Sequence, residues 1–311
     1  MLTTPVVRCL KEQVEDAEVH FLTKKEFLPV VRGNPFINKI HILDGNMYAL
    51  LQSLKVERFD YILDLHRNFR SLRVRSSLKI MSFTVDKINL AKFIMIRFKV
   101  NRLPEKHIVD RYMATTRMFD VTNDGKGLDY FIPAEEEVEL SSLPESFRSG
   151  YIALVVGAMH ATKQMPVEKM INICRELDLP VIMLGGQREG AMGREIDKQT
   201  GDHVLNTCGQ YNINQSASLI RQSRVVITHD TGLMHIAASF HKKILSVWGH
   251  TIPEFGMYPY LPDRASKIFE VVGLPCRPCT KIGKEKCPKG HFRCMNDIDH
   301  KEIVSTAKKI F

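Results

Sequence analysis

The chain has 311 residues, of which 44% are hydrophobic and 25% charged, and its formal net charge is +9 at pH 7. These fractions are typical of a folded globular protein and exclude a disordered chain, while the length allows two domains with separate cores. No stretch approaches the roughly 20 apolar residues that span a bilayer. The segment Met1–Pro5 also lacks the charged and apolar regions of a signal peptide. We therefore expect a cytoplasmic protein.

Strand and helix patterns alternate along the first half of the chain. Apolar residues at helical spacing predict a first helix over residues 4–15, and β-prone runs predict strands over 19–22, 39–43 and 61–65, with helices at 25–31 and 47–55 between them. Residues 67–121 read as mostly helical, with one strand at 80–85. Such alternation predicts a parallel sheet covered by helices.

The same alternation resumes in the second half. A stretch rich in proline and glutamate, residues 129–150, has the composition of a linker. Apolar runs after it predict strands over 151–156, 181–184, 203–205, 225–228 and 244–247. We expect a first α/β domain over residues 1–147, a second over 148–298, and a C-terminal helix over 299–311.

The most informative segment begins with the predicted strand Val225–Thr228. The turn after it contains Asp230, Thr231 and Gly232, and apolar residues then recur at helical spacing. Asp230 or Thr231 can cap this helix, and Gly232 lets a ligand approach the backbone closely. The free amides and the helix dipole favour a phosphate or diphosphate there. Comparable strand–turn–helix units also occur in doubly wound sheets without a site.

The run Asp230–Ala238, followed by Trp248–Gly249 and Pro253, resembles the signature of glycosyltransferase family 9. The resemblance extends from Leu2 to the terminal helix. It implies a GT-B fold of two facing Rossmann-like domains. It also implies an inverting transferase that moves heptose, or a related sugar, from ADP-heptose or another nucleotide sugar to a lipopolysaccharide core acceptor. No metal or other cofactor is implied.

The resemblance also implies which residues bind the donor. Thr162 and Lys163 would contact the two phosphates, and Glu189, which follows two glycines, would accept hydrogen bonds from the nucleoside. We expect Asp230 to cap its helix and accept a sugar hydroxyl, because a carboxylate repels phosphate. The remaining donor-binding residues are Thr231, Gly232, Leu233 and His235.

The catalytic base stays unassigned. Family members supply an Asp from a loop between the first strand and the first helix, and Leu2–Arg8 matches the first residues of that helix. We therefore expect the first domain to lack its first strand and the loop with that Asp. Asp64 and its neighbour His66 are the best remaining candidates but are not assigned as the base. The alternative to an active enzyme is an impaired remnant that binds the nucleotide sugar without transferring it.

A basic segment occupies residues 66–106, with 11 lysines or arginines against two acidic residues. A solvated helix face is one explanation, and an anionic partner is the other. Six apolar residues interleave with this charge, which favours lipid headgroups over nucleic acid: Phe69, Leu72, Phe93, Ile94, Ile96 and Phe98. We expect peripheral contact with the inner face of the inner membrane and no nucleic-acid binding.

Four cysteines near the C-terminus follow the pattern C-x2-C-x7-C-x6-C: Cys276, Cys279, Cys287 and Cys294. Three interpretations remain open, namely a structural metal such as zinc, reduced thiols packed together, and a disulfide. A catalytic role is not expected. A sugar-nucleotide epimerase of the same fold would need a carboxylate pair near the sugar, and the sequence offers no convincing pair.

Overall fold

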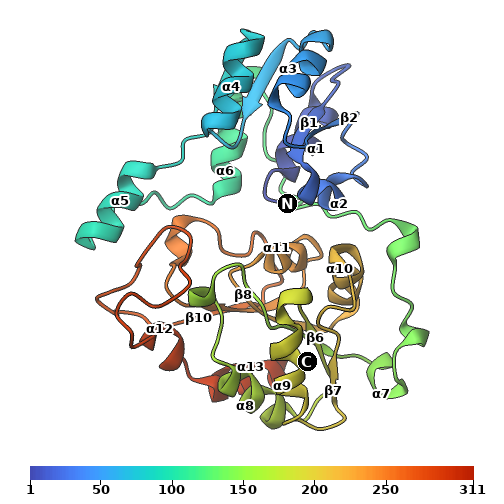
Figure 1. The fold of residues 1–311 in the computed structure, drawn as a ribbon, viewed down its shortest axis with the longest axis vertical. Helices are drawn as coiled ribbons and strands as arrows, with labels where there is room; N and C mark the ends of the chain where they lie inside the picture. Colours follow the sequence, from blue (N-terminus) through green and yellow to red (C-terminus); the bar gives the residue numbers. More distant parts are fainter. The chain divides into compact units, whose positions relative to one another are not determined.

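A computed structural model describes all residues 1–311 (Figure 1). The chain divides into two compact units. Unit 1 comprises Met1–Asn89 and Lys106–Phe131, and unit 2 comprises Leu90–Glu105 and Ile132–Phe311. No helix combines the length and the apolar character needed to cross a membrane.

The boundary of unit 2 lies earlier in the chain than expected, because the acidic stretch before residue 148 bonds to unit 2. The carboxylate of Glu137 accepts hydrogen bonds from Ser218 and Arg221, each at 2.7 Å. The amide of Val138 donates to the Ser218 hydroxyl at 3.0 Å. The terminal helix belongs to the same unit, since its apolar face joins the unit 2 core.

Unit 1 contains four strands, β1 (His20–Lys24), β2 (Lys39–Leu43), β3 (Tyr61–Asp64) and β4 (Met81–Thr84). Its helices of four residues or more are α1 (Thr4–Gln13), α2 (Leu28–Val31), α3 (Met47–Val56), α4 (Phe69–Leu78) and α6 (Ile108–Met113). All four strands lie where the sequence predicted them. They form two separate parallel pairs, β1 with β2 and β3 with β4. Unit 1 is thus Rossmann-like in its alternation, with two strand pairs in place of one continuous sheet.

Unit 2 contains a six-stranded parallel sheet in the order β10-β9-β8-β5-β6-β7. Its strands are β5 (Ile152–Val155), β6 (Val181–Leu184), β7 (Val204–Asn206), β8 (Val225–His229), β9 (Lys243–Trp248) and β10 (Lys267–Glu270). Its helices are α5 (Asn89–Phe98), α7 (Glu145–Arg148), α8 (Val167–Leu177), α9 (Gly190–Asp197), α10 (Ile213–Gln222), α11 (Gly232–Ser239), α12 (Arg293–Asn296) and α13 (His300–Ile310). The five predicted strands are confirmed, and β10 was not predicted.

The strands of unit 2 are continuous apolar runs because helices cover both faces of the sheet. Helices α8, α9 and α13 lie on one side of it, and α10 and α11 lie on the other (Figure 1). Every residue of β5, β6 and β8 is buried. From β5 the chain proceeds to β6 and β7 on one side, then returns to β8, β9 and β10 on the other. The loops that follow β5 and β8 therefore flank the topological switch point, where open parallel sheets bind ligands.

Candidate functional site

An ion pair joins the two loops at the switch point. The Lys163 Nζ lies 2.5 Å from the Asp230 Oδ2, and the two side chains are only 14% and 9% exposed. The hydroxyl of Thr251, in the loop after β9, donates to the same carboxylate oxygen at 3.1 Å. Lys163 and Asp230, which the sequence predicted for one pocket, are thus in direct contact.

Helix α11 begins beside this ion pair. Its N-cap is Thr231, whose hydroxyl accepts a hydrogen bond from the Met234 amide at 3.5 Å. The expectation that Asp230 caps the helix is therefore wrong, because its carboxylate is bound to Lys163 and Thr251. A Cβ added to Gly232 would meet no atom within 4 Å, so the first turn is open. Its amides can be reached by an anion.

The other predicted residues of α11 lie in its first turn. Leu233 is half-buried and His235 is buried. Together with Thr231 and Gly232, four of the predicted donor-binding residues thus share one helix start.

The Thr162 hydroxyl, which was predicted to contact a donor phosphate, is bonded within the protein. It donates to the carbonyl of Lys284 at 3.0 Å and accepts from the amide of Lys284 at 2.9 Å. The residue is 2% exposed. In this structure the hydroxyl therefore fixes the loop that carries Lys163, and it does not face solvent.

Glu189 lies between the loops after β5 and β6. Its Oε2 accepts a hydrogen bond from the Gly186 amide at 2.9 Å. A Cβ on Gly157 would come within 2.5 Å of the Glu189 side chain, so a larger residue there would displace the carboxylate from this position. The half-buried carboxylate is thus held against the end of β5, next to the switch point.

A buried arginine that the sequence analysis did not single out supports the loop after β9. Arg277 donates from Nη2 to the carbonyl of Thr251 at 2.7 Å and pairs with Glu270 at 2.5 Å. It thereby positions the residue that contacts Asp230. The cysteine pattern marks this segment in the sequence, but no sequence feature predicts the contact of Arg277 with Thr251.

Two buried histidines near the site are neutral. Burial lowers the pKa of His229 to about 4, against the opposing effects of the Gly157 backbone and the Asp230 charge. Burial likewise lowers the pKa of His250 to about 4. His250 Nδ1 lies 3.1 Å from the Thr162 carbonyl, and His229 Nε2 accepts from the Met165 amide at 2.9 Å. Neither ring therefore adds positive charge, which leaves Lys163 as the cation of the contact.

The C-terminal cysteines form neither a disulfide nor a group with metal-ligand spacing. All are free thiols, and the one cluster of three or more candidate ligands lies elsewhere in the chain. The Cys279 Sγ donates to the Cys276 carbonyl at 3.1 Å. Burial raises the pKa of the Cys294 thiol to about 12. The Cys279 and Cys294 thiols are thus held by packing and, for Cys279, by a hydrogen bond to the backbone.

The carboxylate of Asp64 is bound by groups of the turn and helix that follow β3. Its Oδ1 accepts from the amides of His66 and Arg67 at 3.1 and 2.6 Å, and its Oδ2 lies 3.0 Å from the Arg75 Nε. The carboxylate is buried. These contacts give Asp64 a structural role and leave His66 exposed beside it.

Two Rossmann-like units, one of them built on a doubly wound parallel sheet, are the architecture of the GT-B class. The sequence profile described as glycosyltransferase family 9 (heptosyltransferase) matches residues 47–289. The chain belongs to this family and is a glycosyltransferase.

Named relatives are similar over most of the chain. Lipooligosaccharide heptosyltransferase 2 of Haemophilus influenzae is 23% identical over 82% of this chain and 77% of its own length. The Campylobacter jejuni protein of the same name is 23% identical over 100% of this chain and 94% of its own length.

Solved structures share the fold. Escherichia coli ADP-heptose lps heptosyltransferase II superposes with a TM-score of 0.72 at 17% identity, over 99% of this chain and 94% of that one. A family 9 glycosyltransferase from Veillonella parvula superposes with a TM-score of 0.75 at 17% identity, over 99% and 92% of the two chains. These likenesses confirm the GT-B fold.

Proposed function

We propose that this glycosyltransferase moves a heptose, or a closely related sugar, from ADP-heptose to a lipopolysaccharide core acceptor with inversion at the anomeric carbon. Family membership supports the transfer, and the names of the relatives support the sugar and the acceptor. A further family structure, a heptosyltransferase from Escherichia coli, contains ADP. The observation that carries the proposal is the Lys163–Asp230 pair beside the open start of α11.

In this proposal the donor diphosphate lies against the first turn of α11. Lys163 exchanges its contact with Asp230 for a contact with phosphate oxygens. Negative charge on the diphosphate grows as its bond to the sugar breaks, so a cation and fixed amides stabilise the transition state more than the bound donor. The buried Thr162 keeps the Lys163 loop in place while this charge develops.

The remaining polar groups orient the donor. Asp230, released from Lys163, keeps its hydrogen bond from Thr251 and accepts one from a sugar hydroxyl. Glu189, held beside the end of β5, accepts hydrogen bonds from the ribose. Thr231, Gly232, Leu233 and His235 form the wall at the start of α11.

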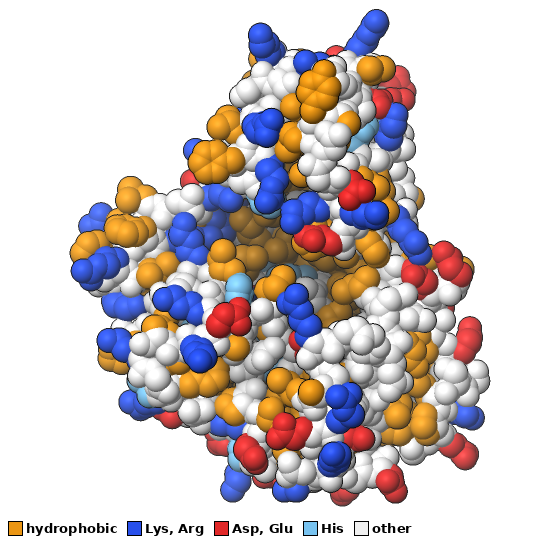
Figure 2. All heavy atoms as spheres, viewed as in Figure 1, with side chains coloured by type: hydrophobic (Ala, Val, Ile, Leu, Met, Phe, Trp, Pro, Cys, Tyr) orange, Lys and Arg blue, Asp and Glu red, His pale blue; other side chains and the backbone are white.

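We further propose that α5 brings the enzyme to the inner face of the inner membrane, where a lipid-borne acceptor is anchored. On α5, Leu90, Phe93 and Phe98 are 72%, 54% and 61% exposed. Lys92 and Arg97 lie among them in the sequence, and Figure 2 shows basic and hydrophobic side chains together on the segment that Figure 1 labels α5. Apolar insertion and attraction to anionic headgroups add on such a helix.

Replacement of Lys163 tests the proposed chemistry. Lys163→Met should lower kcat/KM for transfer from ADP-heptose by about 10²- to 10³-fold, the usual effect of removing one group that stabilises developing charge. Lys198→Met, which removes an exposed lysine after α9, is the matched control and should keep normal activity. Equal activity of both variants would contradict the role of Lys163. Binding of ADP by the wild type without any transfer would favour a nucleotide-sugar-binding remnant.

A further inference from the structure

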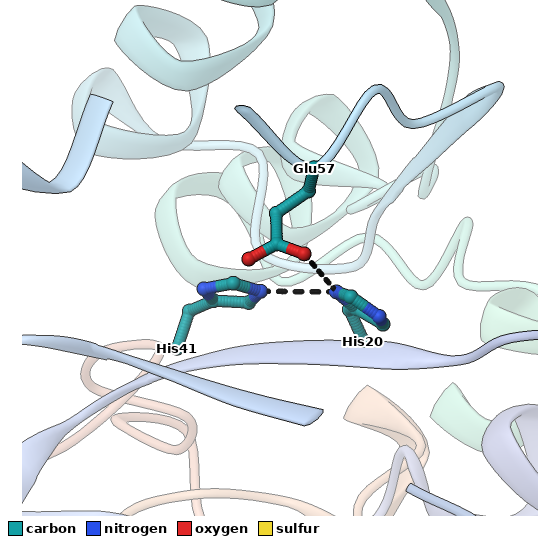
Figure 3. Close-up of side chains that lie close together, drawn as sticks. All are labelled: His20, His41 and Glu57. Carbon is teal, nitrogen blue, oxygen red and sulfur yellow. Dashed lines mark hydrogen bonds and ion pairs between the residues drawn. The ribbon is translucent and has the colours of Figure 1, made fainter. Parts of the chain in front are cut away.

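Unit 1 contains a cluster of two histidines and a glutamate that the proposed transfer reaction does not use (Figure 3). His20 opens β1 and His41 lies in the middle of β2. In the parallel register His20 pairs with Lys39, two residues before His41, so both rings lie on the same face of the strand pair. Glu57, the residue that ends α3, points its carboxylate at the rings.

The spacing of the three side chains matches the needs of a transition-metal ion. The His20 Nδ1 lies 3.0 Å from the His41 Nε2 and 3.8 Å from the Glu57 Oε2. All three ligand atoms lie within 4.8 Å of one another. Zinc bonds of about 2.0–2.1 Å in tetrahedral geometry place two nitrogen ligands about 3.3 Å apart. An ion could lie between these atoms if it replaced the hydrogen bond between the two rings and the three side chains turned toward it.

The surroundings of the cluster favour its use as a ligand set. The ring of Phe59 packs edge-on against both imidazoles, with centroid distances of 5.1 and 5.9 Å, and so fixes their orientation. The Glu18 carboxylate lies 4.0 Å from the His20 Nε2, on the side of the ring away from the cluster.

One cation already touches the cluster. The Lys39 Nζ lies 2.5 Å from the Glu57 Oε1, the oxygen that does not face His20. Lys39 is half-exposed, so its ion pair is weak and can yield to a divalent ion. It therefore competes with a metal, and its removal should strengthen metal binding.

We propose that His20, His41 and Glu57 bind one zinc ion, with a fourth position left for water. Imidazole and carboxylate ligands suit zinc among the common divalent ions. The ion would join β1, β2 and the end of α3 within unit 1. It would therefore stabilise that unit and have no part in the chemistry at Lys163.

The test is zinc binding by the full chain after removal of metals with a chelator, measured by calorimetry and by metal analysis of the dialysed protein. The wild type should bind one zinc through this cluster. His20→Asn should weaken binding at least about tenfold, and Lys39→Met should strengthen it up to about fivefold. His300→Asn is the matched control, because His300 faces Glu176 at 3.0 Å in unit 2 and should leave binding unchanged.

Cobalt distinguishes this cluster from the cysteines near Cys276. Cobalt held by thiolates absorbs strongly in the near ultraviolet, whereas nitrogen and oxygen ligands give only weak visible bands. Weak bands that His20→Asn abolishes would support the proposal. Zinc binding that is absent, or unchanged in His20→Asn and Lys39→Met, would overturn it. A strong thiolate band as the sole signal would overturn it as well. Should His20→Asn fail to fold, the Lys39→Met result decides.

Discussion

The Lys163–Asp230 pair should be energetically coupled, and the coupling can be measured. Lys163→Met leaves a carboxylate that is 9% exposed with only the Thr251 hydroxyl as partner, so unit 2 should lose about 3 kcal/mol of stability. Asp230→Asn strands an ammonium that is 14% exposed and should cost about 2 kcal/mol. The double variant contains no unpaired charge. Its loss should therefore fall short of the sum of the single losses by about 2 kcal/mol.

The single tryptophan provides the readout. Trp248 is fully buried at the end of β9, so its fluorescence follows the unfolding of unit 2 in urea. Binding of ADP gives a second measure of the same pair. Lys163→Met should weaken ADP binding about tenfold or more, whereas Asp230→Asn should leave it unchanged or tighter because the competing anion is gone. Additive losses of stability, or weaker ADP binding in Asp230→Asn than in Lys163→Met, would refute this account.

Three further results are expected. The pKa of His229 is about 4 in the folded protein and 6.5 in the unfolded chain, so the unfolded chain binds more protons between these pH values. The free energy of unfolding of unit 2 should therefore fall by up to about 3 kcal/mol through this group as pH falls from 6.5 to 4. In urea titrations His229→Gln should lower the pH dependence of this free energy by about 1.4 kcal/mol per pH unit. Arg277→Met should destabilise unit 2 by about 3 kcal/mol and weaken ADP binding, because it removes a buried cation that holds the Thr251 loop. The control Arg293→Met removes only an exposed ion pair with Asp297 and should change the urea unfolding of unit 2 little. Replacing Phe93 and Phe98 together with serine should reduce sedimentation with vesicles that contain anionic lipid, without changing transfer to a detergent-solubilised acceptor.

Each of these results has an outcome that would contradict it. An unchanged pH slope in His229→Gln would mean that His229 does not titrate as a buried neutral ring. Equal unfolding of the Arg277 and Arg293 variants would remove the proposed link between the cysteine segment and the site. Unaltered vesicle binding by the serine variant would direct the search for a membrane contact away from α5.

The sequence predicted the unit 2 sheet well because its strands are buried on both faces and so appear as uninterrupted apolar runs. The exception is β10, in which Phe269 alone is fully buried and the first two residues are exposed. Such a short edge strand lacks the pattern by which strands are recognised. Its position became evident only from its pairing with β9.

The family resemblance predicted Lys163 and Asp230 as donor-binding residues, but it could not predict the contact between them. Asp230 and Thr231 are both good cap residues, and only the backbone geometry shows that Thr231 is the cap. Thr251 and Arg277 act through hydrogen bonds between distant loops, which leave no spacing pattern. The histidine cluster leaves no sequence pattern for the same reason, since the pairing of β1 with β2 brings the two histidines together and the end of α3 adds Glu57.

The most direct test of the proposed function is the mass of a lipopolysaccharide acceptor with a deeply truncated core after incubation with ADP-heptose and this chain. The account predicts an acceptor heavier by one heptosyl residue, with one ADP released for each residue added. It also predicts loss of this product with Lys163→Met but not with Lys198→Met. An unmodified acceptor beside bound or hydrolysed donor would contradict heptosyl transfer to a lipopolysaccharide core by this enzyme.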